Sequence, residues 1–313
     1  MSSVGVIGAG NVGVGVVDAL AMLGIAKEIY LYNRTKSLAE AQAWDINDAV
    51  PLLNGNTNVT PTDDLEDLRG CEIIAITSGA KQEAGESRLA LVKKNTTIII
   101  ELMQKLDVIN PDAIIIIVTN PVDIMTRIAR EYSTREAKKL FGSGTVLDTL
   151  RLREELGLRL NINRKNIHAF IVGEHGDSEF ALWSVATIGP VLLENFGIDK
   201  LETMKVEILQ KVRERAYRII ERKGYTKQAI GVAVAKLIKS ILQDEKRIFT
   251  LSTKLSEKCR KVQSDVVLSQ PCVLGKEGIE KVLILECNIA EYDSLKNSIE
   301  VLDKTYKSIK KES

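Results

Sequence analysis

His175 is the residue of this sequence that offers acid–base chemistry most directly, because the only other histidine is His168. It stands in "GEHGDS", between two glycines at the expected end of a short strand, and loops at such positions often carry functional side chains. An imidazole titrates near neutral pH and can therefore give or take a proton in a reaction. A single histidine is also a frequent surface or core residue, so this prediction depends on its partners.

Asp148 and Arg151 are candidate partners in "GSGTVLDTLRLR", three residues apart at the expected start of a helix and therefore on one helix face. The plain interpretation is an ion pair within the helix. The alternative is that Asp148 orients a histidine while Arg151 binds a substrate carboxylate through two parallel N–H groups. Two isolated histidines without a nearby cysteine or paired carboxylate argue against a metal site, and we expect none.

A glycine-rich turn near the start of the chain predicts a nucleotide cofactor. "GAGNVG" supplies Gly8, Gly10 and Gly13 in GxGxxG spacing after an expected strand, with Asn11 and Val12 completing the turn. Such glycines permit a tight turn, a close approach of the backbone to a pyrophosphate, and close packing of helix on strand. The motif alone is compatible with any glycine-tolerant turn, but its place at the first strand–helix junction favours dinucleotide binding.

Asn33 ends the second expected strand, 20 residues after Gly13. An acidic residue at this spacing would bind the ribose hydroxyls of NAD. Asn33 lacks the charge that repels the 2′-phosphate of NADP, and Arg34 and Thr35 can donate hydrogen bonds to that phosphate. We predict that NADP(H) is accepted. The alternative is that Asn33 binds the ribose hydroxyls and Arg34 points into solvent, which leaves NAD(H) as the cofactor.

These residues fall on an alternation of strands and helices in the first half of the chain. Four aliphatic runs are expected to be strands, at 4–8, 28–33, 72–78 and 113–120, and helical patterns lie at 11–24, 36–49, 86–106 and 122–133. The runs are continuously apolar, as expected when helices cover both faces of a sheet. The sequence therefore predicts an α/β fold with a doubly wound parallel sheet and a site at the carboxyl ends of its strands.

The pattern changes after about residue 145. One short strand is expected before His175, helices at 201–222 and 226–244, strands at 265–275 and 281–289, and then a final polar helix. These mixed elements predict a second, α+β domain. We expect a dinucleotide-binding domain at 1–145 and a substrate-binding, catalytic domain at 146–313, packed tightly because no Pro/Gly/Ser-rich linker separates them.

Composition excludes several classes of partner. The net charge is +1, from 43 basic and 42 acidic residues, and no basic surface for nucleic acid is expected. The first residues lack the pattern of a signal peptide, and the longest aliphatic run, at 113–118, is too short to span a bilayer. Four scattered cysteines fit a reducing compartment. We expect a cytoplasmic protein without nucleic-acid or membrane partners.

Six motifs together resemble the L-lactate/malate dehydrogenase family. In chain order they are "GAGNVG", "GAKQEAGESRLALVKKN", "VTNPVD", "GSGTVLDTLRLR", "GEHGDS", and "KGYT" with the following "AIG". Their order and spacing cover about residues 4–305 and are far more specific than any single motif. The resemblance implies a Rossmann fold and an enzyme that interconverts pyruvate and L-lactate with a nicotinamide cofactor, NAD(H) in most of the family.

The resemblance also implies catalytic roles. His175 would be the general acid/base, Asp148 would hold its tautomer, and Arg151 would bind the substrate carboxylate. Arg88 would close over the substrate on a lid and polarise its carbonyl group. The segment 78–95 that carries Arg88 can also be interpreted as an ordinary solvated loop.

Substrate choice would depend on Gln82, with Asn120 and Thr226 also lining the pocket. Lactate-specific members of the family have glutamine at this position, and malate-specific members have arginine. A second substrate carboxylate buried without a cation would cost several kcal/mol, so pyruvate or a slightly larger 2-oxo acid is favoured. Lys81 could partly compensate, which keeps malate dehydrogenase as the alternative. The two residues after Thr226 depart from the family pattern and leave the pocket size open.

The cofactor would also contact Ser78, Gly79, Thr119 and Asn120, according to the same resemblance. "NRT" after the second strand is similar to the NADP-selecting turn of shikimate dehydrogenases, which adds to the prediction for NADP(H).

Arg153 and His168 match positions that bind fructose 1,6-bisphosphate in allosterically activated bacterial members, at a subunit interface. The resemblance therefore implies a homo-oligomer, a tetramer by comparison with the family, with a possible sugar bisphosphate effector. The alternative is a surface arginine and an ordinary histidine.

Two other functions remain open. One is a malate or broader 2-hydroxyacid dehydrogenase. The other is a non-catalytic dinucleotide-binding sensor, which is disfavoured because the fold itself needs none of His175, Asp148, Arg151 or Arg88.

Overall fold

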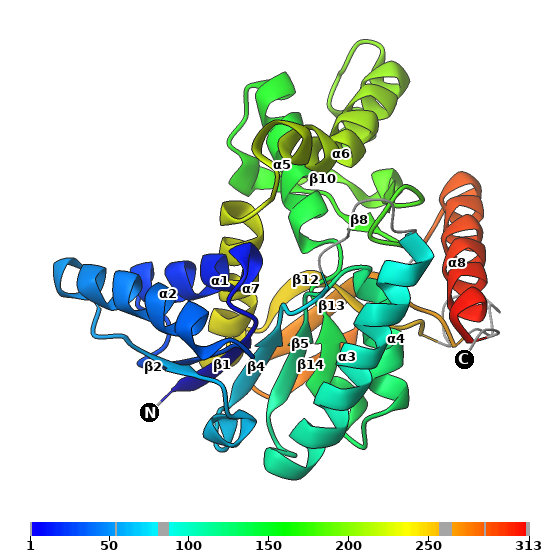
Figure 1. The fold of residues 1–313 in the computed structure, drawn as a ribbon. Coiled ribbons are helices and arrows are strands. Elements are labelled where there is room, and N and C mark those ends of the chain that lie inside the picture. Colours follow the sequence, from blue (N-terminus) through cyan, green and yellow to red (C-terminus); the bar gives the residue numbers. More distant parts are fainter. Residues whose placement is uncertain (1, 54, 81–87, 257–264, 285, 311–313) are drawn as a thin grey trace.

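A nine-stranded sheet forms the centre of the molecule in a computed structural model that describes residues 2–53, 55–80, 88–256, 265–284 and 286–310 (Figure 1). In spatial order the strands are β14 (Gly278–Val282), β13 (Val267–Gly275), β12 (Arg247–Lys254), β6 (Leu140–Gly142), β5 (Ile114–Ile117), β4 (Ile73–Ile76), β1 (Ser3–Ile7), β2 (Glu28–Tyr32) and β3 (Asn58–Thr62).

The strands from β3 to β6 are parallel, and the chain order reverses between β1 and β4. This is the doubly wound arrangement that the sequence predicts, with its switch point beside the glycine-rich turn. The four expected strands are confirmed as β1, β2, β4 and β5. Three further strands of the sheet were missed: β3, a polar edge strand that contains Pro61, β6, which has only three residues, and the antiparallel strand β12.

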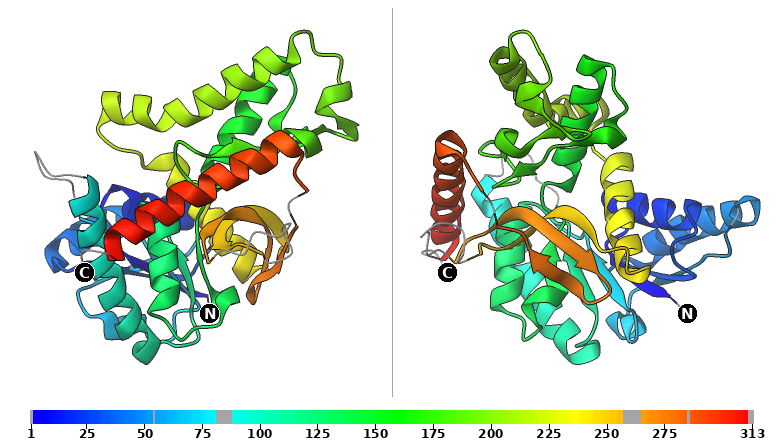
Figure 2. Two further views of the ribbon diagram at one scale, coloured as in Figure 1. Left: turned by 90° about the vertical axis from the view of Figure 1, so that its right-hand side faces the viewer. Right: turned by 180° about the vertical axis from the view of Figure 1, so that it is seen from behind.

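Helices cover both faces of the sheet, which explains why β4 and β5 are buried along their whole length. On one face lie α1 (Asn11–Met22), α2 (Lys36–Ala49) and α7 (Gln228–Leu242). On the other lie α3 (Arg88–Ile109), α4 (Val122–Glu131) and α8 (Ile289–Lys310). Alternate residues of one strand serve the two cores: Ile116 packs into the first and Ile115 into the second. Figure 2 shows α8 running beside α3 and α4.

The second half of the chain mixes helices and strands, as the predicted α+β domain would, but it does not have a wholly separate sheet. Its strands β12, β13 and β14 extend the central sheet in antiparallel order. A third core lies between α5 (Val146–Leu160), α6 (Leu201–Lys223) and two small sheets. Those sheets contain β7 (Ile167–His168), β10 (Thr187–Ile188) and β11 (Val191–Leu192), and β8 (Ile171–Val172) with β9 (Phe180–Ala181). The boundary between residues 145 and 146 stays a prediction.

Two expected strands in this half need correction. The single strand before His175 is two strands, because β7 pairs with β10 whereas β8 pairs with β9. The strand expected at 281–289 ends at Val282, since β14 is the edge of the sheet and the chain then leaves it for α8. Short 3₁₀ helices connect other elements, at Val50–Leu52, Leu65–Leu68, Ala137–Lys139, Arg164–Asn166, Trp183–Val185 and Leu193–Asn195.

Among the described residues, no helix has the length and apolar character that crossing a bilayer requires.

Candidate active site

His175 and Asp148 form a hydrogen-bonded pair where the two halves of the chain meet. His175 lies in the loop between β8 and β9, and Asp148 lies in the first turn of α5. The distance between His175 Nδ1 and Asp148 Oδ2 is 2.7 Å, and the side chains are 27% and 3% exposed. A buried carboxylate at this distance fixes the ring and favours the tautomer with a proton on Nδ1, which leaves Nε2 for chemistry.

Arg151 binds the other oxygen of the same carboxylate. Its Nη1 donates to Asp148 Oδ1 at 2.9 Å, across the i,i+3 spacing on α5 that the sequence predicts. Burial opposes the charge on Asp148, but His175 and Arg151 hold the pKa of this carboxyl below its usual range. The residues therefore form the ion pair of the plain interpretation, and the same aspartate also contacts the histidine, as the alternative expects. The binding of a substrate carboxylate by Arg151 stays a prediction.

The electrostatics of this pair keep His175 protonated at neutral pH. Burial alone would lower the pKa of the imidazole, but the Asp148 carboxylate, with further contributions from the Asp123 and Glu179 carboxyl groups, acts against burial, and the pKa is raised to about 9. The site can therefore present an imidazolium to a bound molecule at physiological pH.

Asp123 holds the backbone of the histidine loop. Its Oδ2 accepts the His175 backbone N–H at 2.7 Å, and its Oδ1 accepts the Ser252 hydroxyl at 2.5 Å. Burial raises the pKa of Asp123 to about 6, although these two hydrogen bonds work against the rise. The sequence does not reveal this role, although Asp123 lies within "VTNPVD", because its partners are 52 and 129 residues away.

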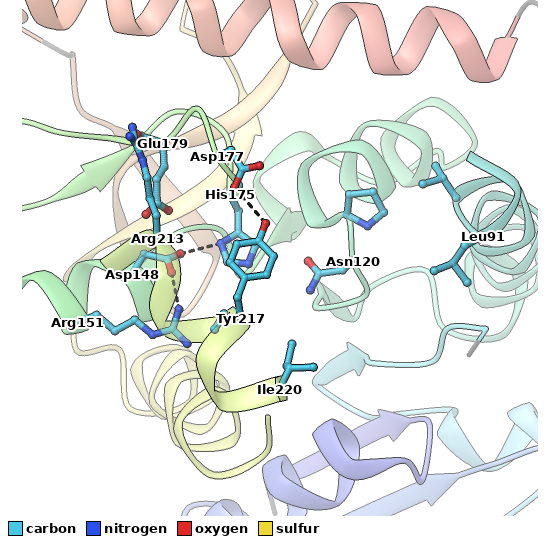
Figure 3. Close-up of a pocket in the computed structure, with 14 residues that line it drawn as sticks. Leu91, Asn120, Asp148, Arg151, His175, Asp177, Glu179, Arg213, Tyr217 and Ile220 are labelled. Atoms are coloured by element: carbon cyan, nitrogen blue, oxygen red, sulfur yellow. Dashed lines mark hydrogen bonds and ion pairs between the residues drawn. The ribbon is translucent and has the colours of Figure 1, made fainter. Parts of the chain in front are cut away.

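A cavity of about 260 Å³ opens beside the pair (Figure 3). Its walls come from α3, the start of α4, α5, the histidine loop and α6. The lining residues are Leu91, Val92, Asn120, Pro121, Asp148, Arg151, His175, Gly176, Asp177, Glu179, Arg213, Ala216, Tyr217 and Ile220. Four predicted site residues, Asn120, Asp148, Arg151 and His175, are thus brought together around one space that is large enough for a small organic acid.

Glu179 and Arg213 also line this cavity, and the sequence did not point to either. Glu179 is 2% exposed, and its Oε1 has no hydrogen-bond partner among the described residues. Burial raises the pKa of Glu179 to about 9, and the adjacent Asp148 carboxylate adds to that rise. The side chain of Arg213 donates to the Glu179 backbone carbonyl and so links α6 to the histidine loop. No motif or spacing identifies these residues, because only the packing of α6 on this loop places them here.

Asp148, His175 and Glu179 each offer one ligand atom, and these atoms lie within 4.8 Å of one another. Two of the three side chains are already hydrogen-bonded to each other, and Arg151 neutralises the shared aspartate. We therefore interpret the cluster as an acid–base site rather than a metal centre.

The glycine-rich turn has the geometry of a phosphate-binding loop. Gly8 has φ +113°, and a Cβ on Gly13 would lie 1.8 Å from the Gly8 carbonyl oxygen, so neither position accepts another residue without a shift. A Cβ on Gly10 would meet nothing within 4 Å, which leaves open space in front of the turn. Within the described residues no side chain caps the N-terminus of α1, so its backbone N–H groups are available to an anion.

The strand ends beside this turn also fit a nucleotide. The hydroxyl of Ser78 is buried without a hydrogen-bond partner in the described part of the chain, as expected for a group that a ligand would satisfy. Thr119 Oγ1 donates to the Ser78 carbonyl at 2.7 Å. Asn95 accepts from the Ala80 N–H at 2.7 Å and donates to the Asn120 carbonyl at 2.9 Å. Asn95 thus fixes both segments, a role that its place inside a helix did not reveal.

Asn33 lies at the end of β2 and organises the neighbouring turn. Its Oδ1 lies 3.5 Å from the Ala9 N–H in the glycine-rich turn, and its Nδ2 donates to the Thr35 carbonyl at 3.0 Å. Arg34 and Thr35 are exposed beside it at the start of α2. The three predicted residues therefore lie next to the glycine-rich turn.

Three predicted substrate residues are not among the described residues that line the cavity. Gln82 and the side chain of Arg88 lie outside the described residues. Thr226 lies on the connection between α6 and α7 and is not among the residues that line the cavity. Its role stays a prediction.

Arg153 contacts the residue that follows His168 in the chain, and neither Arg153 nor His168 lines this cavity. Arg153 Nε donates to the Ala169 carbonyl at 3.0 Å, and its guanidinium lies 4.9 Å from the Phe170 ring centroid. His168 is exposed at the end of β7. This proximity is compatible with the predicted effector site, which stays a prediction.

Family models match both halves of the chain. The model of the lactate/malate dehydrogenase NAD-binding domain matches residues 2–142, and that of the lactate/malate dehydrogenase alpha/beta C-terminal domain matches residues 145–313.

Similar proteins match over nearly the full length. The chain is 38% identical to an L-lactate dehydrogenase of Clostridium botulinum, over 97% of this chain and 96% of that protein. It is 39% identical to an L-lactate dehydrogenase of a Thermoanaerobacter species, over 96% of this chain and 97% of that protein. Among solved structures, a lactate dehydrogenase from a deep-sea metagenome of the Medee basin has a TM-score of 0.93 at 32% identity and 99% coverage of both chains. The minor L-lactate dehydrogenase of Enterococcus mundtii has a TM-score of 0.93 at 29% identity and 98% coverage of both chains.

Proposed function

Because the chain belongs to the lactate/malate dehydrogenase family, we propose that it is a cytoplasmic L-lactate dehydrogenase that interconverts pyruvate and L-lactate. The observation that carries this proposal is the array of His175, Asp148 and Arg151 on one wall of the cavity, with Asn120 on another. A non-catalytic sensor would need no such array.

Each residue of the array has a distinct task in reducing a 2-oxo acid. Arg151 binds the substrate carboxylate with the N–H groups that Asp148 does not use. His175 donates the proton on Nε2 to the substrate carbonyl oxygen, which becomes the hydroxyl oxygen of the product. Asp148 stabilises the imidazolium before transfer and keeps the Nδ1 proton in place after it. When bound, the reduced nicotinamide supplies the hydride that adds to the carbonyl carbon.

The reduction needs a protonated His175, so its rate should follow the raised pKa. The imidazolium prevails below pH 9 and is lost as the pH rises through the pKa of about 9. We expect kcat/KM for pyruvate reduction to stay level from neutral pH to about pH 8 and to fall about tenfold per pH unit well above pH 9. Oxidation of lactate, which needs the neutral ring, should show the opposite trend.

Steady-state pH profiles in both directions check this expectation, with Glu179→Gln as the comparison. The Glu179 carboxyl has a pKa of about 9 itself, so it helps to hold the proton of His175 only where it ionises, and its removal should move the alkaline limb slightly to lower pH. A wild-type limb at the ordinary imidazole value of about 6.5 would contradict the proposed electrostatics.

The residues around the glycine-rich turn would hold the cofactor. Backbone N–H groups of the turn and of the start of α1 would bind the diphosphate. The strand-end residues Ser78, Gly79, Thr119 and Asn120 would face the nicotinamide half, where the Ser78 hydroxyl lacks a partner in the described residues. A nicotinamide dinucleotide agrees with the match to the NAD-binding domain model.

We propose further that the enzyme accepts NADP(H). Asn33 places no carboxylate at the end of β2, and its amide already hydrogen-bonds within the turn. Arg34 is exposed beside it and carries the charge that a 2′-phosphate needs. NAD(H) would retain contacts from the amide alone. Both cofactors therefore belong in the test of function.

Pyruvate is the proposed substrate because of the glutamine at position 82, which lies outside the described residues. The same-class rival is a malate or broader 2-hydroxyacid dehydrogenase. The test is a matrix of steady-state rates for pyruvate, oxaloacetate and 4-methyl-2-oxopentanoate, each with NADH and NADPH. Highest kcat/KM with pyruvate supports the proposal. Preference for oxaloacetate would favour malate dehydrogenase, and no turnover of any of the three would favour the sensor.

We also propose a homo-oligomer, a tetramer by comparison with the family, with an effector site at Arg153 and His168. Large apolar side chains on α1 and α2 support an interface, since Met22 is 65% and Trp44 is 63% exposed. Fructose 1,6-bisphosphate at millimolar concentration should raise activity at subsaturating pyruvate. Unchanged activity would remove the effector site from the proposal.

A further inference from the structure

Lys227 and Asp18 form an ion pair between the two halves of the chain. Lys227 Nζ lies 2.8 Å from Asp18 Oδ2, and the side chains are 26% and 25% exposed. Asp18 belongs to α1, the helix that begins at the glycine-rich turn. Lys227 is the residue directly before α7 and directly after Thr226. The pair therefore joins the proposed cofactor-binding helix to the segment that carries a proposed substrate residue.

The backbones meet closely at the same place. A Cβ on Gly15 of α1 would lie 2.8 Å from the Lys227 carbonyl oxygen, and a Cβ on Gly231 of α7 would lie 2.2 Å from the Gly15 carbonyl oxygen. Only glycines allow α1 and α7 to approach this far. Close packing of rigid helices limits how far the start of α7 can shift, so a charge pair here acts on a segment with little freedom.

The adjacent position is held as well. Gln228 Oε1 accepts from Lys223 Nζ of α6 at 2.6 Å. The α7 end of the connection, directly after Thr226, is thus held by α1 through Lys227 and by the end of α6 through Gln228. Both contacts use the side chains of these two residues, Lys227 and Gln228.

We propose that Lys227 and Asp18 are positioning residues that fix the Thr226 segment against the cofactor-binding helix and thereby set the affinity for the 2-oxo acid. The inference rests on the proposed function, because it takes Thr226 as a substrate residue. A pair that only stabilised the fold would change the free energy of unfolding and leave KM unchanged. A positioning pair changes KM for the 2-oxo acid and leaves cofactor affinity and kcat nearly unchanged.

The test compares Lys227→Met, Asp18→Asn, the double variant and the charge-exchanged variant D18K/K227D. KM for pyruvate should rise roughly two- to fivefold in each single variant, as expected for a partly exposed charge pair. The double variant should be no worse than either single variant, since both remove one interaction. Charge exchange should recover at least part of the loss. Lys246→Met is the matched control, because Lys246 forms a 2.7 Å ion pair with Glu280 at the far edge of the sheet.

Salt dependence gives a second readout that needs no rescue variant. The pair is partly exposed, so ionic strength should screen it. KM of the wild type and of Lys246→Met should rise with salt, and KM of Lys227→Met should rise less. Wild-type KM values in both Lys227→Met and Asp18→Asn, or an equal loss of NADH affinity, would overturn the positioning role. An inactive wild type would overturn the proposed function first, and the positioning role with it.

Discussion

Replacement of His175 by Asn is expected to lower kcat for pyruvate reduction by at least about 10³-fold, near the upper part of the range for a general acid. Asparagine cannot carry the transferred proton, and it leaves Asp148 with Arg151 as its only charged partner at hydrogen-bond distance among the described residues. The cofactor contacts come from other elements, so the dissociation constant of NADH should stay within about twofold. Stopped-flow rates and fluorescence titration with NADH measure the two quantities separately.

Asp148→Asn is the companion variant for this prediction. Asparagine keeps the shape of the side chain but no longer stabilises the imidazolium, so the pKa of His175 should fall and the rate loss should be greatest at alkaline pH. Thermal unfolding of both variants checks that they fold. Near-wild-type turnover by a folded His175→Asn protein would show that another group supplies the proton.

The central parts of the site could be predicted from the sequence because their geometry is local. Asp148 and Arg151 share a helix face by their spacing alone, and the three glycines of the turn fix their own backbone. Alternating apolar strands and helices likewise determine the parallel sheet, since each strand must be covered on both faces. In these cases a few neighbouring residues determine the local structure.

Other parts depend on contacts between distant segments. Asp123 reaches the backbone of His175 across 52 residues, and the side chain of Arg213 reaches the Glu179 carbonyl across 34. Strand β12 joins β6 through a single paired position, Ser252 with Gly142, which no local pattern announces. Such pairings form only because the assembled fold has the lowest free energy. Neither periodicity nor motif spacing in the sequence therefore reveals them.

The cofactor preference depends both on a local residue, Asn33, and on where the turn places a bound phosphate. Asn33→Asp should lower the ratio of kcat/KM with NADPH to kcat/KM with NADH by at least about a hundredfold. A carboxylate about 4 Å from a phosphate costs about 4 kcal/mol per unit charge near a protein surface, which is about a thousandfold before screening and adjustment of the turn. The same carboxylate would bind the ribose hydroxyls of NADH. The substitution should therefore lower kcat/KM with NADPH and raise kcat/KM with NADH.

Arg34→Ala separates the two sources of this preference. Arg34 is exposed, so its loss should reduce kcat/KM with NADPH by only about three- to tenfold, as for one charge-assisted contact in water. NADH should be unaffected, because it lacks the phosphate that Arg34 would bind. Steady-state kinetics of the wild type and both variants, with each cofactor at one ionic strength, measure these effects. A wild type with kcat/KM more than a hundredfold higher with NADH, or a ratio that Asn33→Asp leaves unchanged, would mean that the end of β2 does not select the cofactor in this enzyme.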